Sequence, residues 1–272
     1  MKIANRYREA IADVRRVVVK IGSRVLVQKT GRPDVRRMRM LTKEIALIQK
    51  SGREVVVVTS GAVAAGMEAL GMKQRPAQLP DLQMAAAVGQ TRLMSKYDEL
   101  FGAAGCKIGQ LLLTHGDFLQ KVRLTNVRRT MENLLRNGVI PMVNENDVVA
   151  DEEIKAGLSF GDNDYLASLV VKMVRADLLV LLTTVDGLQE KSANGRMKRV
   201  PYLEKITRKT MSLVSDHESD ISKGGMGTKL KAARAASRAG CTVVIGNGRE
   251  SKMLTRIIEG KDVGTMILAS GV

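Results

Sequence analysis

The chain has 272 residues, of which 44% are hydrophobic and 26% charged, so we expect a globular fold with one large core or two smaller ones. Its 44 lysines and arginines exceed its 28 aspartates and glutamates, giving a formal net charge of +16 that favours an anionic ligand or partner. Two cysteines and two histidines rule out a disulfide framework and argue against a multi-histidine metal centre.

The remaining counts argue against two kinds of partner. Four tyrosines, three phenylalanines and no tryptophan are few for stacking on nucleic-acid bases, so no specific nucleic-acid partner is expected. Residues 1–16 are charged throughout and contain no apolar core of a signal peptide. Because no apolar run has the length of a transmembrane helix, the sequence predicts a cytoplasmic protein with no membrane partner.

Short apolar runs alternate with amphipathic stretches along the chain. The apolar runs, rich in β-branched residues or leucine, predict strands over 17–21, 54–59, 108–113, 139–143, 178–182 and 242–245. Apolar residues three or four apart predict helices that begin near Asp34 and Asp81, and others over 123–137, 163–175, 226–239 and 251–258. This alternation predicts an α/β fold, a three-layer αβα sandwich around a mainly parallel sheet.

The stretch 183–205 is polar. It contains Asn194-Gly195, a pair typical of a two-residue β-hairpin turn. We expect a soft boundary near 175–185, between an N-terminal half (1–175) and a smaller C-terminal half (176–272), with the sheet running through both.

Residues suited to binding follow four of the predicted strands. In open α/β sheets, ligands bind beyond the carboxyl ends of the strands. One strand carries Lys20 and is followed by Gly22, and the others are followed by Ser60-Gly61, by the run Asn144 to Asp147 and by Thr183-Thr184. We therefore expect these residues to meet at one edge of the sheet.

Lys20 interrupts the apolar run VVVKI, where a buried strand normally has an aliphatic residue. One interpretation is an edge-strand lysine whose ammonium group reaches solvent. The other is a cation held beside a phosphate, with Gly22 allowing the backbone to approach closely. The second interpretation is favoured.

Two further segments precede predicted helices. Ser60-Gly61 suits either a plain helix N-cap or a group of free N–H donors that bind a carboxylate or phosphate. The run from Gly161 to Asp164 has more polar groups than one cap needs. It lacks the glycine and glutamate of an EF-hand, so its carboxylates and amide could order Mg²⁺, a lysine or a substrate amine.

The run from Lys223 to Lys229 is the most informative stretch. Its three glycines and two lysines precede a helical pattern, as in loops that bind phosphates through N–H groups and positive charge. The order Gly-Thr-Lys differs from a Walker A loop. A flexible surface loop is the alternative, and Gly246-Asn247-Gly248 resembles a dinucleotide fingerprint only faintly.

Seven stretches, in the same order along the chain, resemble the amino acid kinase family, and most closely its glutamate 5-kinases. They are VVVKIGSRVL (17–26), VVVVTSGAVAAG (55–66), AAVGQTRLM (86–94), IPMVNENDVVA (140–150), FGDNDYLASLV (160–170), LLTTVDGL (181–188) and GGMGTKLKAA (224–233). The resemblance implies a single kinase domain over 1–272 that phosphorylates the side-chain carboxylate of L-glutamate with ATP, the first step of proline biosynthesis.

The resemblance also implies roles for individual residues. Lys20 and Lys229 would be catalytic cations at the transferring phosphoryl group, and Asp164 would orient them. Ser60, Gly61, Asp147 and Asn163 would bind glutamate. The nucleotide would be bound by Lys20, Gly22, Thr183, Thr184, Lys223, Gly224, Gly225, Met226, Gly227, Thr228 and Lys229. Mg²⁺ is implied with ATP, but no direct protein ligand for it is predicted.

A glutamate carboxylate has a pKa near 4.3, so about one in 500 is protonated at pH 7 and the nucleophile needs no general base. What the reaction needs is cancellation of the repulsion between carboxylate and triphosphate. Two lysines, Mg²⁺ and glycine N–H groups would provide that.

The resemblance has further implications and two departures. It implies a homodimer or homotetramer, possible inhibition by L-proline and a short form without a C-terminal PUA domain. Thr184 stands where an aspartate is usual, and Gln189 where a tyrosine is usual. The alternatives are a related kinase for N-acetylglutamate or aspartate and, with less support, a basic nucleic-acid-binding protein.

Overall fold

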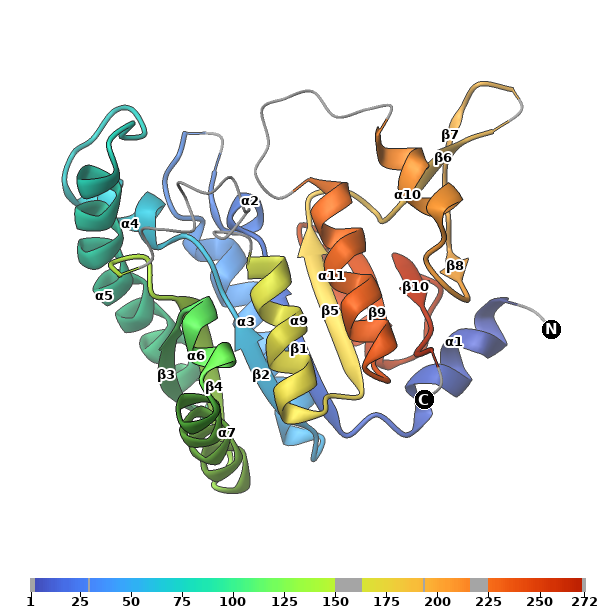
Figure 1. Cartoon of the computed structure of the whole chain (residues 1–272), viewed down its shortest axis with the longest axis horizontal. Helices are drawn as coiled ribbons and strands as arrows, with labels where there is room; N and C mark the ends of the chain where they lie inside the picture. Colours follow the sequence, from blue (N-terminus) through green and yellow to red (C-terminus); the bar gives the residue numbers. More distant parts are fainter. Residues whose placement is uncertain (1–2, 29, 150–162, 193, 216–224, 271–272) are drawn as a thin grey trace.

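The fold is built on an eight-stranded sheet, seen in a computed structural model that describes residues 3–28, 30–149, 163–192, 194–215 and 225–270 (Figure 1). The strand order is β3-β4-β2-β1-β5-β9-β10-β8. The strands are β1 (Arg16–Ile21), β2 (Glu54–Val58), β3 (Lys107–Leu113), β4 (Val139–Glu145), β5 (Leu178–Thr183), β8 (Tyr202–Leu203), β9 (Thr242–Asn247) and β10 (Thr265–Ile267). The sheet therefore continues from the N-terminal half of the chain into the C-terminal half.

The six longest strands, β1 to β5 and β9, pair in parallel with their neighbours in the sheet. β10 is the exception, because it runs antiparallel to β9. Strand β1 lies between β2 and β5, with Lys20 paired in register with Val58 and Leu181. The predicted mainly parallel sheet is confirmed, and each predicted strand agrees with an observed one to within two residues at either end.

Helices cover both faces of the sheet. One face packs against α1 (Ile3–Ala12), α2 (Ser23–Leu26), α3 (Val35–Lys50), α4 (Ala62–Ala69), α5 (Leu79–Ala103) and α12 (Met253–Ile258). The other packs against α6 (His115–Leu119), α7 (Lys121–Arg136), α9 (Asn163–Val174), α10 (Arg208–Ser215) and α11 (Met226–Arg238). Each face has its own apolar cluster, so the three-layer αβα sandwich is confirmed.

The alternation of side chains along β1 fixes where Lys20 lies. Val17, Val19 and Ile21 belong to the cluster on the α3–α5 face, and Val18 belongs to the cluster on the α9–α11 face. Because successive strand residues point to opposite faces, Lys20 points to the same side as Val18. The Lys20 side chain therefore lies on the face of the sheet that α9 and α11 cover.

Helices α4 and α5 pack with unusually close backbones. A Cβ atom on Gly66 would lie 1.7 Å from the carbonyl oxygen of Ala85, and one on Gly89 would lie 1.8 Å from that of Ala62. Only glycine fits at these two positions. The contact fixes α4, which follows β2 after Thr59, Ser60 and Gly61, against α5.

The polar stretch near residue 190 forms the predicted hairpin, made of β6 (Gln189–Lys191) and β7 (Met197–Arg199). The prediction of a two-residue turn is wrong. The backbone N–H of Ser192 donates to the carbonyl of Arg196 at 2.8 Å, so the turn between the strands is longer than two residues. Asn194-Gly195 therefore lies within a longer loop, where Gly195 has a φ of +79°. Among the described residues, no helix has the length and apolar character needed to cross a bilayer.

Candidate active site

Lys20 is a buried lysine in the middle of the sheet. It is 4% exposed, and its Nζ lies 2.6 Å from Oδ1 of Asp164. Strand β1 has a neighbour on each side, so the interpretation of Lys20 as an edge-strand lysine reaching solvent is wrong. Burying an ammonium group is costly unless a charged partner compensates it, and Asp164 is that partner.

Asp164 joins Lys20 to a second buried lysine. Its Oδ2 accepts a hydrogen bond from Nζ of Lys229 at 2.9 Å, and Asp164 and Lys229 are 0% and 5% exposed. The carboxylate lies in the first turn of α9, and Lys229 lies in the first turns of α11. Figure 1 shows these two helix starts at the same end of the sheet as the tip of β5.

We call Lys20, Asp164 and Lys229 the triad, and their charges determine which ligands it can stabilise. Burial alone would raise the pKa of Asp164, but the ammonium groups of Lys20 and Lys229 outweigh burial and lower it below its ordinary value. The carboxylate therefore stays ionised, and the triad has one net positive charge in a water-poor setting. Such a fixed charge can stabilise an anion, and more strongly one whose charge increases during a reaction.

Gly22 directly follows β1 at this site. A Cβ atom on it would lie 3.1 Å from the carbonyl oxygen of Leu182 and 3.8 Å from Nζ of Lys20. Its backbone N–H donates to that same carbonyl at 3.2 Å. The glycine therefore keeps the space beside the lysine ammonium group clear of side-chain atoms.

A second cluster, neutral and rich in hydrogen bonds, centres on Asn163. Its Nδ2 donates to Oγ of Ser60 and to the carbonyl of Thr59, both at 2.8 Å, and lies 3.1 Å from Oδ1 of Asn144. These side chains come from the ends of β2 and β4 and from the start of α9. We call Thr59, Ser60, Asn144 and Asn163 the amide cluster.

The amide cluster adjoins the triad, because Asn163 and Asp164 are consecutive residues of α9. The Ser60-Gly61 pair begins α4 as one interpretation predicted, with Gly61 and not Ser60 as the N-cap. The cap residue is Gly61, whose φ of +105° is left-handed and favours glycine, and no side-chain hydrogen bond caps the helix. The start of α4 therefore leaves its first backbone N–H groups without a side-chain cap.

Two residues of α5 that the sequence analysis missed support this cluster. Oε1 of Gln90 accepts from Nδ2 of Asn144 at 2.8 Å, and the Tyr97 hydroxyl lies 2.9 Å from Oγ1 of Thr59. Gln90 was inside a recognised motif, AAVGQTRLM, but nothing in that motif indicates its partner. Tyr97 reads as an ordinary core residue of an amphipathic helix.

Asp147 lies in the turn after β4, half-buried. Burial raises its pKa to about 6, and the positive charge of Arg75 opposes the rise. Within the described residues, no hydrogen bond joins its side chain to Ser60 or Asn163. The predicted grouping of Asp147 with those residues therefore stays a prediction.

Only some of the residues predicted to bind the nucleotide are among those that the structure describes. Thr183 ends β5, Thr184 follows it, and Gly225 is the N-cap of α11, whose first residues are Met226, Gly227 and Thr228. The Thr228 hydroxyl donates to the carbonyl of Gly225 at 2.9 Å, which fixes this first turn. Lys223 and Gly224 lie outside the described residues, as do Gly161 and Asp162.

The faint dinucleotide pattern at 246–248 has a packing explanation instead. A Cβ atom on Gly248 would lie 2.8 Å from Cγ1 of Val25 and 3.0 Å from Cβ of Leu182. The glycine is therefore needed for close packing of the chain after β9 against α2 and β5.

The described residues do not offer Mg²⁺ a set of protein ligands. They contain no cluster of three or more histidines, cysteines, aspartates or glutamates arranged around a common point. Both oxygens of Asp164 already contact lysine ammonium groups, so this carboxylate is not available to a metal.

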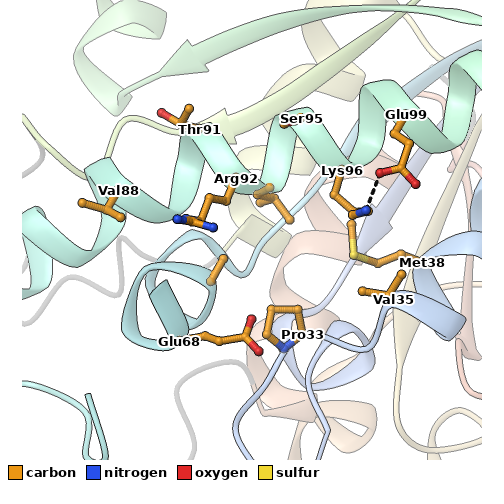
Figure 2. Close-up of a pocket in the computed structure, with 12 residues that line it drawn as sticks. Pro33, Val35, Met38, Glu68, Val88, Thr91, Arg92, Ser95, Lys96 and Glu99 are labelled. Atoms are coloured by element: carbon orange, nitrogen blue, oxygen red, sulfur yellow. Dashed lines mark hydrogen bonds and ion pairs between the residues drawn. The ribbon is translucent and has the colours of Figure 1, made fainter. Parts of the chain in front are cut away.

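A cavity of about 700 Å³ lies away from both clusters, between the start of α3, α4 and α5 (Figure 2). Pro33, Val35 and Met38 form one side, and Arg92 and Lys96 of α5 lie on the other. Lys96 forms an ion pair with Glu99. None of the predicted site residues lines this cavity, whereas the triad brings three buried charged side chains together.

Comparison with known proteins identifies the family of the chain. Residues 15–247 match the model of the amino acid kinase family. The glutamate 5-kinase of Geobacter metallireducens is 43% identical over 260 residues, which are 95% of this chain and 69% of the relative. The glutamate 5-kinase of Clostridium tetani is 39% identical over 260 residues, 95% of this chain and 96% of the relative.

A solved structure shares the fold. It is the carbamate kinase from Giardia lamblia bound to AMP-PNP, with a TM-score of 0.65 and 18% sequence identity, covering 95% of this chain and 100% of that one. The family model covers the strands and helices that carry both clusters, and the glutamate 5-kinases match nearly the whole chain. The chain therefore belongs to the amino acid kinase family and, within it, to the glutamate 5-kinases.

Proposed function

We propose that this chain transfers the γ-phosphoryl group of ATP to the side-chain carboxylate of L-glutamate, forming L-glutamyl 5-phosphate for proline biosynthesis. The observation that carries the proposal is the buried triad of Lys20, Asp164 and Lys229 beside the neutral amide cluster. A fixed positive charge suits the transferring group, and hydrogen-bonding amides suit a polar amino acid.

The triad answers the main electrostatic difficulty of this reaction. Attack of a carboxylate on a triphosphate brings two anions together, and charge shifts toward the bridging oxygen as the bond to it breaks. We propose that Lys20 and Lys229 offset this charge and that Asp164 holds their ammonium groups in place. No general base is needed, since the attacking carboxylate is already ionised at neutral pH.

We propose that glutamate binds at the amide cluster through Ser60, Gly61 and Asn163. The uncapped N–H groups at the start of α4 suit a carboxylate, and Ser60 and Asn163 offer further polar contacts. Asp147 would pair with the α-ammonium group of the substrate. This pairing would favour an amino acid over its N-acetylated form.

We propose that the nucleotide lies along the ends of β5 and β9 and the start of α11. Lys20, Gly22, Thr183, Thr184 and residues 223–229 would contact it. The N-terminus of α11 presents backbone N–H groups and the positive end of the helix dipole to phosphate oxygens. Mg²⁺ would enter with ATP, held by phosphate oxygens.

Three wider expectations remain proposals, the first from the sequence composition and the other two from the resemblance. They are a cytoplasmic location, assembly into homodimers or homotetramers, and inhibition by L-proline. Sedimentation and an activity titration with proline test the last two directly.

The proposal is tested by trapping the product. An acyl phosphate reacts with hydroxylamine to give a hydroxamate, so ATP-dependent hydroxamate formation is measured with glutamate, N-acetylglutamate and aspartate in parallel. We expect product with glutamate and little with the other two acids. Product with another acid and none with glutamate would overturn the proposal.

A further inference from the structure

We propose that Tyr97 of α5 is a positioning residue for the glutamate site, acting through Thr59. This inference rests on the proposed function, since it assigns a task to a residue outside the first layer of the same site. The hydrogen bond of its hydroxyl is to a residue outside the predicted substrate-binding set. Its hydroxyl reaches Thr59, the residue before Ser60.

The contact is buried and specific. Tyr97 is 1% exposed and Thr59 is 0% exposed, and their side-chain oxygens lie 2.9 Å apart. Burial raises the pKa of Tyr97 above its ordinary value, so the hydroxyl stays protonated and able to donate. A hydrogen bond sealed from water is stronger than an exposed one and costly to leave half made.

Thr59 is the point at which three elements meet. Its backbone N–H donates to the carbonyl of Val143 in β4 at 2.9 Å, and its carbonyl accepts from Nδ2 of Asn163 in α9 at 2.8 Å. Its side-chain hydroxyl contacts the Tyr97 hydroxyl of α5. Movement of Thr59 would therefore shift both Ser60 and the amide of Asn163.

The sequence of α5 repeats this arrangement two turns earlier. Gln90 lies seven residues before Tyr97, on the same face of the helix, and its Oε1 accepts from Asn144 at the end of β4. One helix face thus holds the ends of β2 and β4, the two strands that supply the amide cluster. Helix α5 contributes no predicted substrate contact, so this support is indirect.

The chain provides a matched control in Tyr7 of α1. Tyr7 is also 1% exposed, and its hydroxyl donates to backbone carbonyls of Pro201 and Gly264. Those partners belong to the region around β8 and β10, at the edge of the sheet opposite β3 and β4. Tyr7→Phe and Tyr97→Phe therefore remove the same atom from similarly buried places.

The test compares the two variants in the hydroxamate assay and in thermal unfolding. We expect Tyr97→Phe to raise KM for glutamate about threefold to tenfold, the range that loss of one buried hydrogen bond predicts, with kcat changed less than about twofold and KM for ATP unchanged. We expect Tyr7→Phe and Tyr97→Phe to lower Tm by similar amounts. Tyr7→Phe should leave KM for glutamate and KM for ATP unchanged.

A double-mutant cycle assigns the effect to Thr59. Thr59→Val removes the partner hydroxyl, and Tyr97→Phe should add little to KM in that background, because the bond is already lost. An unchanged KM for glutamate in Tyr97→Phe, or an equal rise in KM in Tyr7→Phe, would overturn the inference. The proposed function would still stand in that case if the wild-type protein turned over glutamate. Absence of glutamate turnover in the wild type would instead refute the proposed function.

Discussion

The triad and the amide cluster share one helix start but are built from opposite kinds of interaction. The triad has two ammonium groups on one carboxylate, all at most 5% exposed. The amide cluster contains no charged side chain among its four members and relies on hydrogen bonds near 2.8 Å. A fixed charge acts most strongly where charge changes during the reaction, whereas a neutral network holds a molecule in place. We therefore expect damage to the triad to lower kcat and damage to the amide cluster to raise KM.

The largest effect is expected from Lys229→Ala. Removal of this ammonium group takes away a charge that stabilises the transition state, so kcat should fall by at least about a hundredfold, measured by steady-state kinetics. Lys231→Ala, an exposed lysine on the same helix, is the control and should keep wild-type kcat. An unchanged kcat in Lys229→Ala would show that this lysine does not stabilise the transition state.

Asp164→Asn should lower both kcat and stability. The variant leaves two buried ammonium groups without their anion, and breaking a buried ion pair costs about 3–5 kcal/mol in unfolding free energy. We expect kcat to fall about tenfold to a hundredfold and urea unfolding to show the loss of stability. Asp98→Asn, exposed on α5, is the control. A stable Asp164→Asn enzyme with normal kcat would contradict the role of the triad.

Asn163→Ala tests the amide cluster. The amide donates to Thr59 and Ser60 and would contact glutamate, so KM for glutamate should rise about tenfold while kcat changes less. Asn126→Ala on the exposed face of α7 should leave KM unchanged. A large fall in kcat with normal KM would show that the two clusters do not divide the work as proposed.

A smaller effect on KM is expected when the pH is lowered from 7.5 to 6. The pKa of Asp147 is about 6 in the free protein, so its carboxylate is charged at pH 7.5, half protonated at pH 6 and mostly neutral at pH 5. If the charged form binds the substrate ammonium group, KM for glutamate should rise about twofold at pH 6 and about tenfold at pH 5. Asp147→Asn should show a high KM that is nearly flat over this range. A wild-type KM independent of pH would exclude the pairing.

Much of the fold was predictable because the strands of a doubly covered sheet are continuous apolar runs. The runs 17–21 and 178–182 contain almost nothing else, and both are strands in the centre of the sheet. The short strands β8 and β10 were missed, since two or three residues cannot show a period. The hairpin loop was predicted too short because Asn194-Gly195 fits several kinds of turn.

The site was predictable where a residue conflicts with its surroundings. Lys20 is conspicuous in an apolar strand, and in the structure Asp164 contacts the ammonium groups of both Lys20 and Lys229. Thr59 and Tyr97 do not conflict with theirs, since threonine suits a strand end and tyrosine suits a helix core. Their contact joins residues 38 positions apart and depends on how α5 packs, which no local pattern shows.

The most direct test of the division between the two clusters is to measure kcat and glutamate KM for Lys229→Ala and Asn163→Ala side by side. The account predicts a loss of kcat of at least about a hundredfold in the first variant and a rise in KM of about tenfold in the second. The same kinetic parameter changing to a similar degree in both variants would contradict it.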